Sequence, residues 1–297
     1  MHTIKINDYK ATVPGSWNEL NKKQLFIIIR FFLLGLPEAD FKLKTILTFL
    51  NIKILAKKPV NDPADNNSFL YVLHKNGYKN FLVAPDQLVE ISNTLDFLFE
   101  TITDEGEEIR IMNSHLSVNL LPKFTYKNKT FYGPADKLFN ITFAEYIVAE
   151  TNYLNFLKSK DELDLNKLVV TLYRFKDPEY IPDNVKTKGD PREQFNDHLI
   201  GRRAVNISKL NTEIKYAVFM FYKGCRNFIV KQFPAAHKPP KKKSSNNLGF
   251  LSLVDALTGG DVTKTDSVRK SYLYDVMVRL EQAAIIIEEI ETIKTKK

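Results

Sequence analysis

The sequence predicts a mainly helical fold that also contains one or two small β-hairpins. Three observations lead to this prediction: apolar residues recur at helical spacing, helix-capping residues precede several such stretches, and a basic stretch rich in proline, serine and asparagine interrupts them near the end. We therefore expect a helical body with N-terminal and central hairpins over residues 1–236, a linker over 237–247, and a C-terminal helical unit over 248–297.

The N-terminal residues predict a hairpin followed by a helix. Strand-forming residues occupy positions 3–6 and 11–13, on either side of a polar turn. Two capping-box patterns follow, one at Ser16 and one at Asn21, and either of them can start the helix. A glycine and a proline end this helix soon after Leu34.

Between the first helix and the middle of the chain, the sequence predicts two more helices and two polar segments. The helices cover residues 38–50 and 85–99, and a proline-containing loop at 59–67 lies between them. The acidic run at 104–108 could bind calcium, but it lacks the alternating oxygen ligands of a calcium loop. We expect a solvent-exposed turn there instead.

The second half of the body predicts a central hairpin and three helices. Alternating aromatic residues over 124–132 surround a polar turn, which is typical of a hairpin. Helices follow from a cap at Thr142, over 161–174 and over 207–233, with an extended loop at 175–190.

The C-terminal unit is expected to contain a short helix and a long one. The short helix covers residues 248–257, and the two glycines at 259 and 260 stop it. The long helix covers residues 266–295 and has the most regular apolar spacing in the chain.

The composition is that of a folded chain in a reducing compartment. Of its 297 residues, 44% are hydrophobic, which is enough to form a sizeable core. The single cysteine, Cys225, excludes an internal disulfide and a cysteine-based zinc site. No signal-peptide pattern is visible at the start, and the most apolar window, residues 25–36, is too short to span a bilayer. We therefore expect a cytoplasmic protein.

The net charge of +8 makes nucleic acid a candidate partner, but the excess is concentrated in two places. Without the lysines of the linker and of the C-terminal end, the chain is close to neutral. These lysines are Lys238, Lys241, Lys242, Lys243, Lys294, Lys296 and Lys297. The candidate nucleic-acid contacts are Lys241, Lys242 and Lys243, although a solvated linker is the commoner role of such a run, and nucleic acid is not the favoured partner.

No motif of an enzyme, metal site or cofactor site is present in the sequence. The five histidines are scattered and lack metal-ligand spacing, and no glycine-rich phosphate loop or nucleophile elbow occurs. Cys225 has an arginine neighbour that could lower its pKa, but a lone cysteine in an apolar helix is more often a packing residue. We therefore expect a binding protein without catalytic, cofactor or metal residues.

The long final helix is the main candidate for association. Its apolar residues alternate spacings of three and four, the pattern of a coiled-coil seam, and the candidate partner-binding residues are Leu273, Val276, Leu280, Ile287 and Ile290. The seam can equally pack on the protein's own body, on a partner, or on a second copy of the chain. A charged segment at 192–203 could form a docking rim, although a solvated helix face is the commoner explanation.

The order of several short motifs is more specific than any one of them. They occupy residues 14–21, 132–136, 140–146, 168–174, 222–226, 253–260 and 273–274. This succession resembles a group of uncharacterised proteins encoded in the tail regions of Bacteroidetes phages and prophages. The closing pattern of a short helix, a glycine break and a long helix is similar to that of phage tail assembly chaperones.

The resemblance implies a transient role in phage tail morphogenesis. Such a chaperone would bind an apolar helical partner, such as the tape-measure protein, and keep it soluble until tail-tube subunits assemble around it. The residues expected to contribute are those of the final seam, with Trp17 and Phe31 as core or groove aromatics. The alternatives are a structural virion protein of the baseplate or neck, and a nucleic-acid-binding protein that acts through its basic linker.

Overall fold

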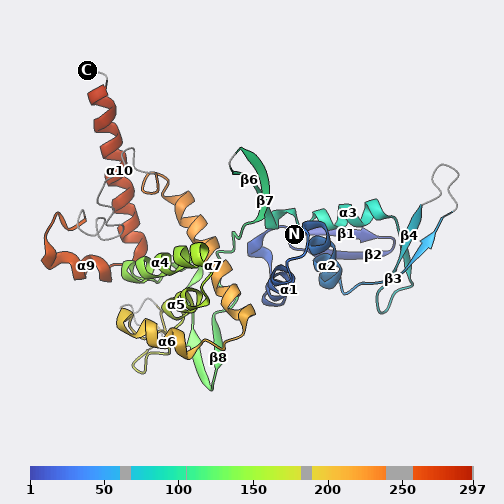
Figure 1. Cartoon of the computed structure of the whole chain (residues 1–297), viewed down its shortest axis with the longest axis horizontal. Coiled ribbons are helices and arrows are strands. Elements are labelled where there is room, and N and C mark those ends of the chain that lie inside the picture. The colour runs from blue at the N-terminus through green and yellow to red at the C-terminus, as the bar shows by residue number, and fades with distance from the viewer. Residues whose placement is uncertain (61–67, 105, 182–188, 239–256, 296–297) are drawn as a thin grey trace. The chain divides into compact units, whose positions relative to one another are not determined.

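The computed structural model describes residues 1–60, 68–104, 106–181, 189–238 and 257–295 (Figure 1). The chain forms two compact units, Met1–Ser114 and His115–Lys297, called unit 1 and unit 2 below. This division differs from the predicted one, in which the basic stretch at 237–247 separates a body from a C-terminal unit. The last helices belong to unit 2, because the start of the final helix forms main-chain hydrogen bonds with the residues around Thr142.

Unit 1 alternates short strands and helices. Its elements are β1 (His2–Ile6), β2 (Tyr9–Val13), η1 (Trp17–Glu19), α1 (Lys22–Leu33), α2 (Glu38–Leu50), β3 (Lys53–Pro59), β4 (Phe69–His74), β5 (Phe81–Val83), α3 (Pro85–Asn93), η2 (Asp96–Leu98), β6 (Phe99–Asp104) and β7 (Glu107–Met112). The strands form three antiparallel sheets of order β1-β2, β3-β4-β5 and β6-β7.

The first hairpin and the first helix of unit 1 form where the turn and capping residues predict them. The hairpin β1–β2 turns at Asn7, which adopts a positive φ of 51°. Helix α1 starts at the second of the two capping patterns: the Asn21 side chain accepts the Gln24 amide, and the Gln24 side chain accepts the Asn21 amide. This reciprocal pairing satisfies two of the donors that a helix leaves open at its start.

The prediction of a mainly helical fold with one or two hairpins is wrong, because the described residues form a mixed α/β structure with nine strands in four sheets. The strands β3 to β7 were missed. The sequence of β3 does not alternate apolar and polar residues, which is the pattern that identifies a strand in a sequence, and every residue of this strand is exposed. The predicted helix over 85–99 ends at Asn93, and Phe99 already begins β6.

Unit 2 contains the central hairpin and most of the longer helices. Its elements are β8 (Lys123–Tyr126), β9 (Lys129–Tyr132), η3 (Asp136–Leu138), α4 (Phe143–Ser159), α5 (Glu162–Leu172), η5 (Asp197–Leu199), α6 (Ile200–Asn206), α7 (Thr212–Gln232), η6 (Val262–Lys264), α9 (Thr265–Lys270) and α10 (Leu273–Thr295). The predicted hairpin over 124–132 is confirmed, with positive φ angles at Lys127 and Asn128 in its turn.

Of the predicted helices of unit 2, one is shorter in the structure and another is divided. The helix expected over 207–233 begins at Thr212, where Asn211 caps it. The final helix expected over 266–295 is broken at Ser271 and Tyr272, so α9 and α10 are separate elements. Most of the predicted helix at 248–257 and of the linker at 237–247 lies outside the described residues.

A buried ionic cluster joins the start of α4 to the end of α5. The Glu145 carboxylate accepts a hydrogen bond of 2.5 Å from the Arg174 guanidinium and lies 3.2 Å from that of Arg192. Arg192 also pairs with Asp190 at 2.7 Å and donates to the Leu172 carbonyl oxygen. Two cations and two anions balance in this cluster, which is the condition for burying charged side chains without a large cost.

Glu145 also caps its own helix. Its second carboxylate oxygen accepts the Thr142 amide at 2.9 Å, and the Thr142 hydroxyl accepts the Glu145 amide. Burial by itself would raise the pKa of Glu145, but the charges of Arg192 and Arg174 outweigh it and lower the pKa below its usual range. The carboxylate therefore remains charged in the folded protein at neutral pH.

Helix α7 approaches the chain at Leu116 closely enough to require a glycine. Gly224 lies in the buried part of α7, and a Cβ at this position would overlap the amide nitrogen and carbonyl oxygen of Leu116. A glycine inside a helix costs about 1 kcal/mol relative to alanine. A glycine is nevertheless required here, because the main chain at Leu116 leaves no room for a Cβ.

Glu145→Ala should lower the free energy of unfolding by about 3–5 kcal/mol, because it leaves two arginines buried without their shared partner. The matched control is Asp197→Ala, which breaks an ion pair that is about 40% exposed on both sides and should cost less than about 1 kcal/mol. Urea unfolding followed by circular dichroism measures both. An equal loss in the two variants would contradict the role of the cluster. The contribution of Glu145 should also disappear as the pH falls through its lowered pKa.

Gly224→Ala should destabilise the protein by at least about 2 kcal/mol, because the added methyl group meets main-chain atoms that cannot rotate away. Gly201→Ala is the control, since Gly201 lies in α6 with no atom within 4 Å of an added Cβ. That variant should gain up to about 1 kcal/mol from higher helix propensity. Thermal unfolding of both variants tests the comparison, and a stabilised Gly224→Ala would refute the close contact.

Candidate functional site

The start of α10 is fixed to unit 2 by main-chain hydrogen bonds. The Leu273 amide donates to the Ile141 carbonyl oxygen at 3.0 Å, and the Phe143 amide donates to the Ser271 carbonyl oxygen at 2.8 Å. The Tyr274 hydroxyl donates to the Lys137 carbonyl oxygen at 2.7 Å, and its ring packs against Phe139. The first turn of α10 is therefore held at the N-terminal end of α4.

The candidate seam of α10 is divided by this attachment. Leu273 is fully buried, Val276 is 3% exposed, and Leu280 is half-buried, so these three side chains pack within unit 2. Ile287 and Ile290 are 58% and 47% exposed. Only the second part of the seam is therefore accessible to a partner in this conformation.

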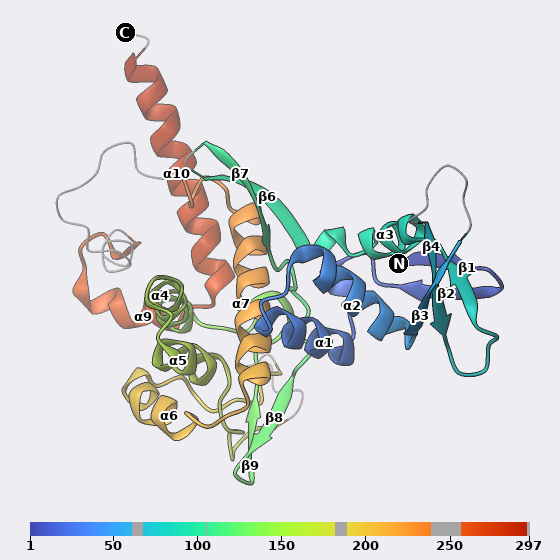
Figure 2. The same cartoon turned by 45° about the vertical axis from the view of Figure 1, so that its right-hand side comes forward.

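The exposed part of α10 presents four isoleucines, here called the isoleucine patch: Ile285, Ile286, Ile287 and Ile290. They lie about one turn beyond Glu281, whose carboxylate accepts the amides of Ala235 and Ala236 in the segment just after α7. Both views show that α10 starts beside α4 and extends away from it toward the C-terminal end of the chain (Figure 1 and Figure 2). The isoleucine patch lies on this outer half.

Sequence analysis missed Ile285 and Ile286, because they lie outside the seam of threes and fours. The signal that could have found them is that three isoleucines stand in a row at 285–287, and consecutive helical residues cannot all face one seam. In the structure, Ile285 and Ile286 are 42% and 55% exposed.

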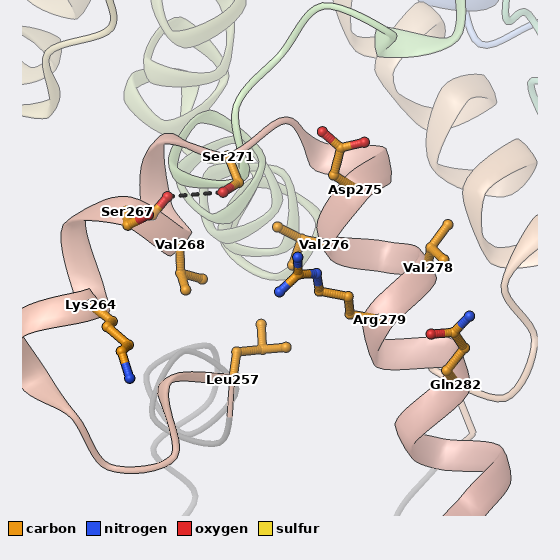
Figure 3. A pocket seen from close by; sticks show the side chains of 10 residues that line it. All are labelled: Leu257, Lys264, Ser267, Val268, Ser271, Asp275, Val276, Val278, Arg279 and Gln282. Atoms are coloured by element: carbon orange, nitrogen blue, oxygen red, sulfur yellow. Dashed lines mark hydrogen bonds between the residues drawn. The ribbon is translucent and has the colours of Figure 1, made fainter.

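A groove of about 680 Å³ lies between α9 and the first half of α10, and its lining on α10 ends at Gln282, one turn before Ile286 of the isoleucine patch (Figure 3). Val268 and Leu257 point into it, and Val276 lies at its base. Lys264 lies at one side of it, and the Arg279 side chain reaches across it toward Val276. The groove has an apolar base and a polar rim, which is the usual composition of a protein-binding surface.

Acidic side chains flank the isoleucine patch. Glu288 and Glu289 lie between its members in the sequence, and both are exposed. Glu288 pairs with Lys238 at 2.7 Å on the surface, which ties α10 loosely to the residues after α7. The patch therefore combines exposed isoleucines with negative charge.

The other residues that the sequence predicts to contact a partner do not lie on the isoleucine patch. Lys241, Lys242 and Lys243 lie outside the described residues. Trp17 is a core residue, with 2% of its surface exposed. Within the predicted docking rim at 192–203, Arg192 is buried in the cluster around Glu145, so its charge is engaged inside the protein rather than offered to a partner.

Within the described residues, no group of three or more histidine, cysteine, aspartate or glutamate side chains is placed to hold a metal ion. Cys225 is completely buried in α7. Burial raises the pKa of its thiol well above the usual value, and the negative charge of Asp136 adds to that effect. A thiolate nucleophile is therefore unfavourable at this position.

In the described part of the chain, no helix has the length and apolar character that crossing a membrane requires.

The motifs that carry the resemblance to phage tail-region proteins occupy structural positions. They supply Thr142 and Glu145 at the cap of α4, Arg174 in the ionic cluster, and Gly224 and Cys225 in the buried part of α7. They therefore support the fold and the attachment of α10 rather than a reactive site.

No family model, no curated protein and no solved structure matches this chain.

Cys225 should react with iodoacetamide at least about 100-fold more slowly in the folded protein than in urea, because the thiol is buried and its pKa is raised. Mass spectrometry of the alkylated protein over time measures the two rates. Equal rates would show that the thiol is accessible and would reopen a nucleophilic role for Cys225.

Proposed function

We propose that this protein binds an apolar helical segment of a partner protein through the isoleucine patch and the adjoining α9–α10 groove. One observation carries the proposal: α10 is fixed at its start and exposes four isoleucines on its outer half. Exposed isoleucines at this density are unfavourable in water, and since each is about half exposed, covering it contributes about 1 kcal/mol. A partner surface that covers them would recover this free energy.

A helix is the partner element that fits the surface. The patch lies on a helix, and helices pack side by side by fitting the side-chain ridges of one into the grooves of the other. Glu288 and Glu289 lie beside the patch, so a partner helix with lysine or arginine next to its apolar face would be favoured. Lys264 of the groove is paired with Asp261, and Asp275 also lines the groove, so Arg279 is the groove side chain that would favour an acidic residue further along that partner.

The narrower form of the proposal is a phage tail assembly chaperone in the cytoplasm of a bacterial host. Its partner would be the tape-measure protein, a long apolar helical chain. The support is the resemblance of the motif order to phage tail-region proteins, together with the exposed apolar half of α10. A chaperone of this class needs a surface that covers apolar helix reversibly, and the patch supplies one.

Two alternatives make different predictions for the same protein. A structural protein of the baseplate or neck would remain in purified particles, whereas a chaperone would be absent from them. A nucleic-acid-binding protein would lose affinity steeply as salt is raised, and would lose it when Lys241, Lys242 and Lys243 are neutralised.

Replacing Ile286, Ile287 and Ile290 together with glutamine should weaken partner binding by at least about 100-fold, because three side chains would each lose at least about 1 kcal/mol of burial. The partner is first recovered by co-expression with the neighbouring genes. Its affinity for the wild-type and variant chains is then measured by calorimetry. The stability of the variant should change little, since all three side chains are exposed in the unbound protein.

The control for this experiment is Val205→Gln, which removes an apolar side chain that is 61% exposed on α6, away from the patch. It should leave binding unchanged. If the triple variant binds as tightly as wild type, the patch is not the binding site. If co-expression recovers no helical protein with either chain, the chaperone proposal fails.

A further inference from the structure

The free edge of β1 faces a groove in unit 1 that is separate from the isoleucine patch. This groove has a volume of about 200 Å³ and is lined by residues 3–7 on one side. Gln87, Glu90, Ile91 and Thr94 line the other side. These four residues are spaced as one face of α3, and Figure 1 shows α3 lying along the β1–β2 hairpin.

The groove runs along the edge of β1 rather than over one of its faces. Side chains of a strand alternate between its two faces, so a groove over one face would be lined by every second residue. Here every residue from 3 to 7 lines it. The main chain of β1 therefore borders the groove.

The register of the hairpin shows which main-chain groups point to this edge. Ile6 and Tyr9 flank a two-residue turn and pair with each other, so Ile6 and Ile4 direct their amide and carbonyl groups toward β2. The groups of Thr3 and Lys5 alternate with them and point away from β2. In the described residues β1 pairs only with β2, and no hydrogen bond between main-chain groups engages Thr3 or Lys5 on the outer edge.

Open amide and carbonyl groups in a row are a template for another strand. A strand added at this edge would place alternate side chains on the same face as Ile4 and Ile6, both 4% exposed, next to the buried Val83 of the groove. Those positions favour apolar residues. The intervening side chains would lie on the solvent face, beside Thr3 and Lys5.

The positive charge of Lys5 determines which side chain of an added strand is favoured next to it. Lys5 faces Lys10 directly across the hairpin, and like charges in opposed positions repel. An acidic side chain placed next to Lys5 on an added strand would relieve this repulsion, whereas residues that face Glu90 across the groove should be apolar or uncharged. A second copy of β1 would bring further lysines to the same place, so a segment of another protein fits better than self-pairing.

We propose that the edge of β1 and the facing side of α3 bind an extended segment of another protein, in which apolar and acidic residues alternate, by adding it as a further strand. The binding mode differs from that of the isoleucine patch. Main-chain hydrogen bonds to Thr3 and Lys5 would provide the affinity, and Lys5 would provide the preference for acidic residues.

The test uses the full chain and two short labelled peptides, one alternating valine with glutamate and one alternating valine with lysine. Fluorescence anisotropy should show the glutamate peptide binding at least about tenfold more tightly. Lys5→Glu should reverse this order. Thr3→Pro removes an amide that points to the groove without removing a bond to β2, and should weaken binding by about tenfold or more.

The matched control is Thr12→Pro, which removes the equivalent outward amide on the opposite edge of the same hairpin. It should bind the glutamate peptide as wild type does. In the wild-type protein, the peptide should slow hydrogen exchange at the amides of Thr3 and Lys5. Circular dichroism of each variant confirms that it is folded.

Three results would overturn the proposal. One is that neither peptide binds, and another is that Thr3→Pro and Thr12→Pro have the same effect. The third is that the wild-type chain self-associates in sedimentation and Thr3→Pro abolishes this, which would identify a second copy of the chain as the occupant of the edge.

Discussion

The carboxylate of Glu145, held between Arg174 and Arg192, is the interaction on which the arrangement of unit 2 depends. A buried charge is stable only when its partners are in place, so the start of α4, the end of α5 and the segment around Arg192 have to meet at one point. The same carboxylate caps α4 through Thr142. Because Thr142 also pairs with Tyr272, the cluster fixes the place where α10 begins.

This anchoring explains how one helix can belong to the core at its start and expose apolar side chains further along. The first turns of α10 bury Leu273 and Val276, while the outer turns expose the isoleucine patch. A helix that is already formed and attached loses little conformational entropy when a partner covers it. The patch on unit 2 and the β1 edge on unit 1 offer different groups, apolar side chains in one case and main-chain donors and acceptors in the other. Each would select a different form of partner, a helix or an extended strand.

Elements defined by neighbouring residues could be predicted from the sequence. The capping pairs Asn21 with Gln24 and Thr142 with Glu145 each act over three residues, and both helices start where these pairs indicate. The strand β3 could not be predicted, because all of its residues are exposed and pairing with β4 alone holds it. The fold class was misjudged mainly because β4, β6 and β7 were not identified, although their sequences contain the aromatic and β-branched residues that are typical of strands.

The sequence by itself determined that the last helix has an apolar seam, that this seam repeats at spacings of three and four, and that caps and turns bound the other helices. Only the tertiary structure decided which half of that seam is covered. Leu273 and Ile287 are equivalent in the repeat, yet one is buried and the other is 58% exposed. The difference arises because the chain near Ile141, far away in the sequence, bonds to the first turn of α10 and does not reach its outer turns.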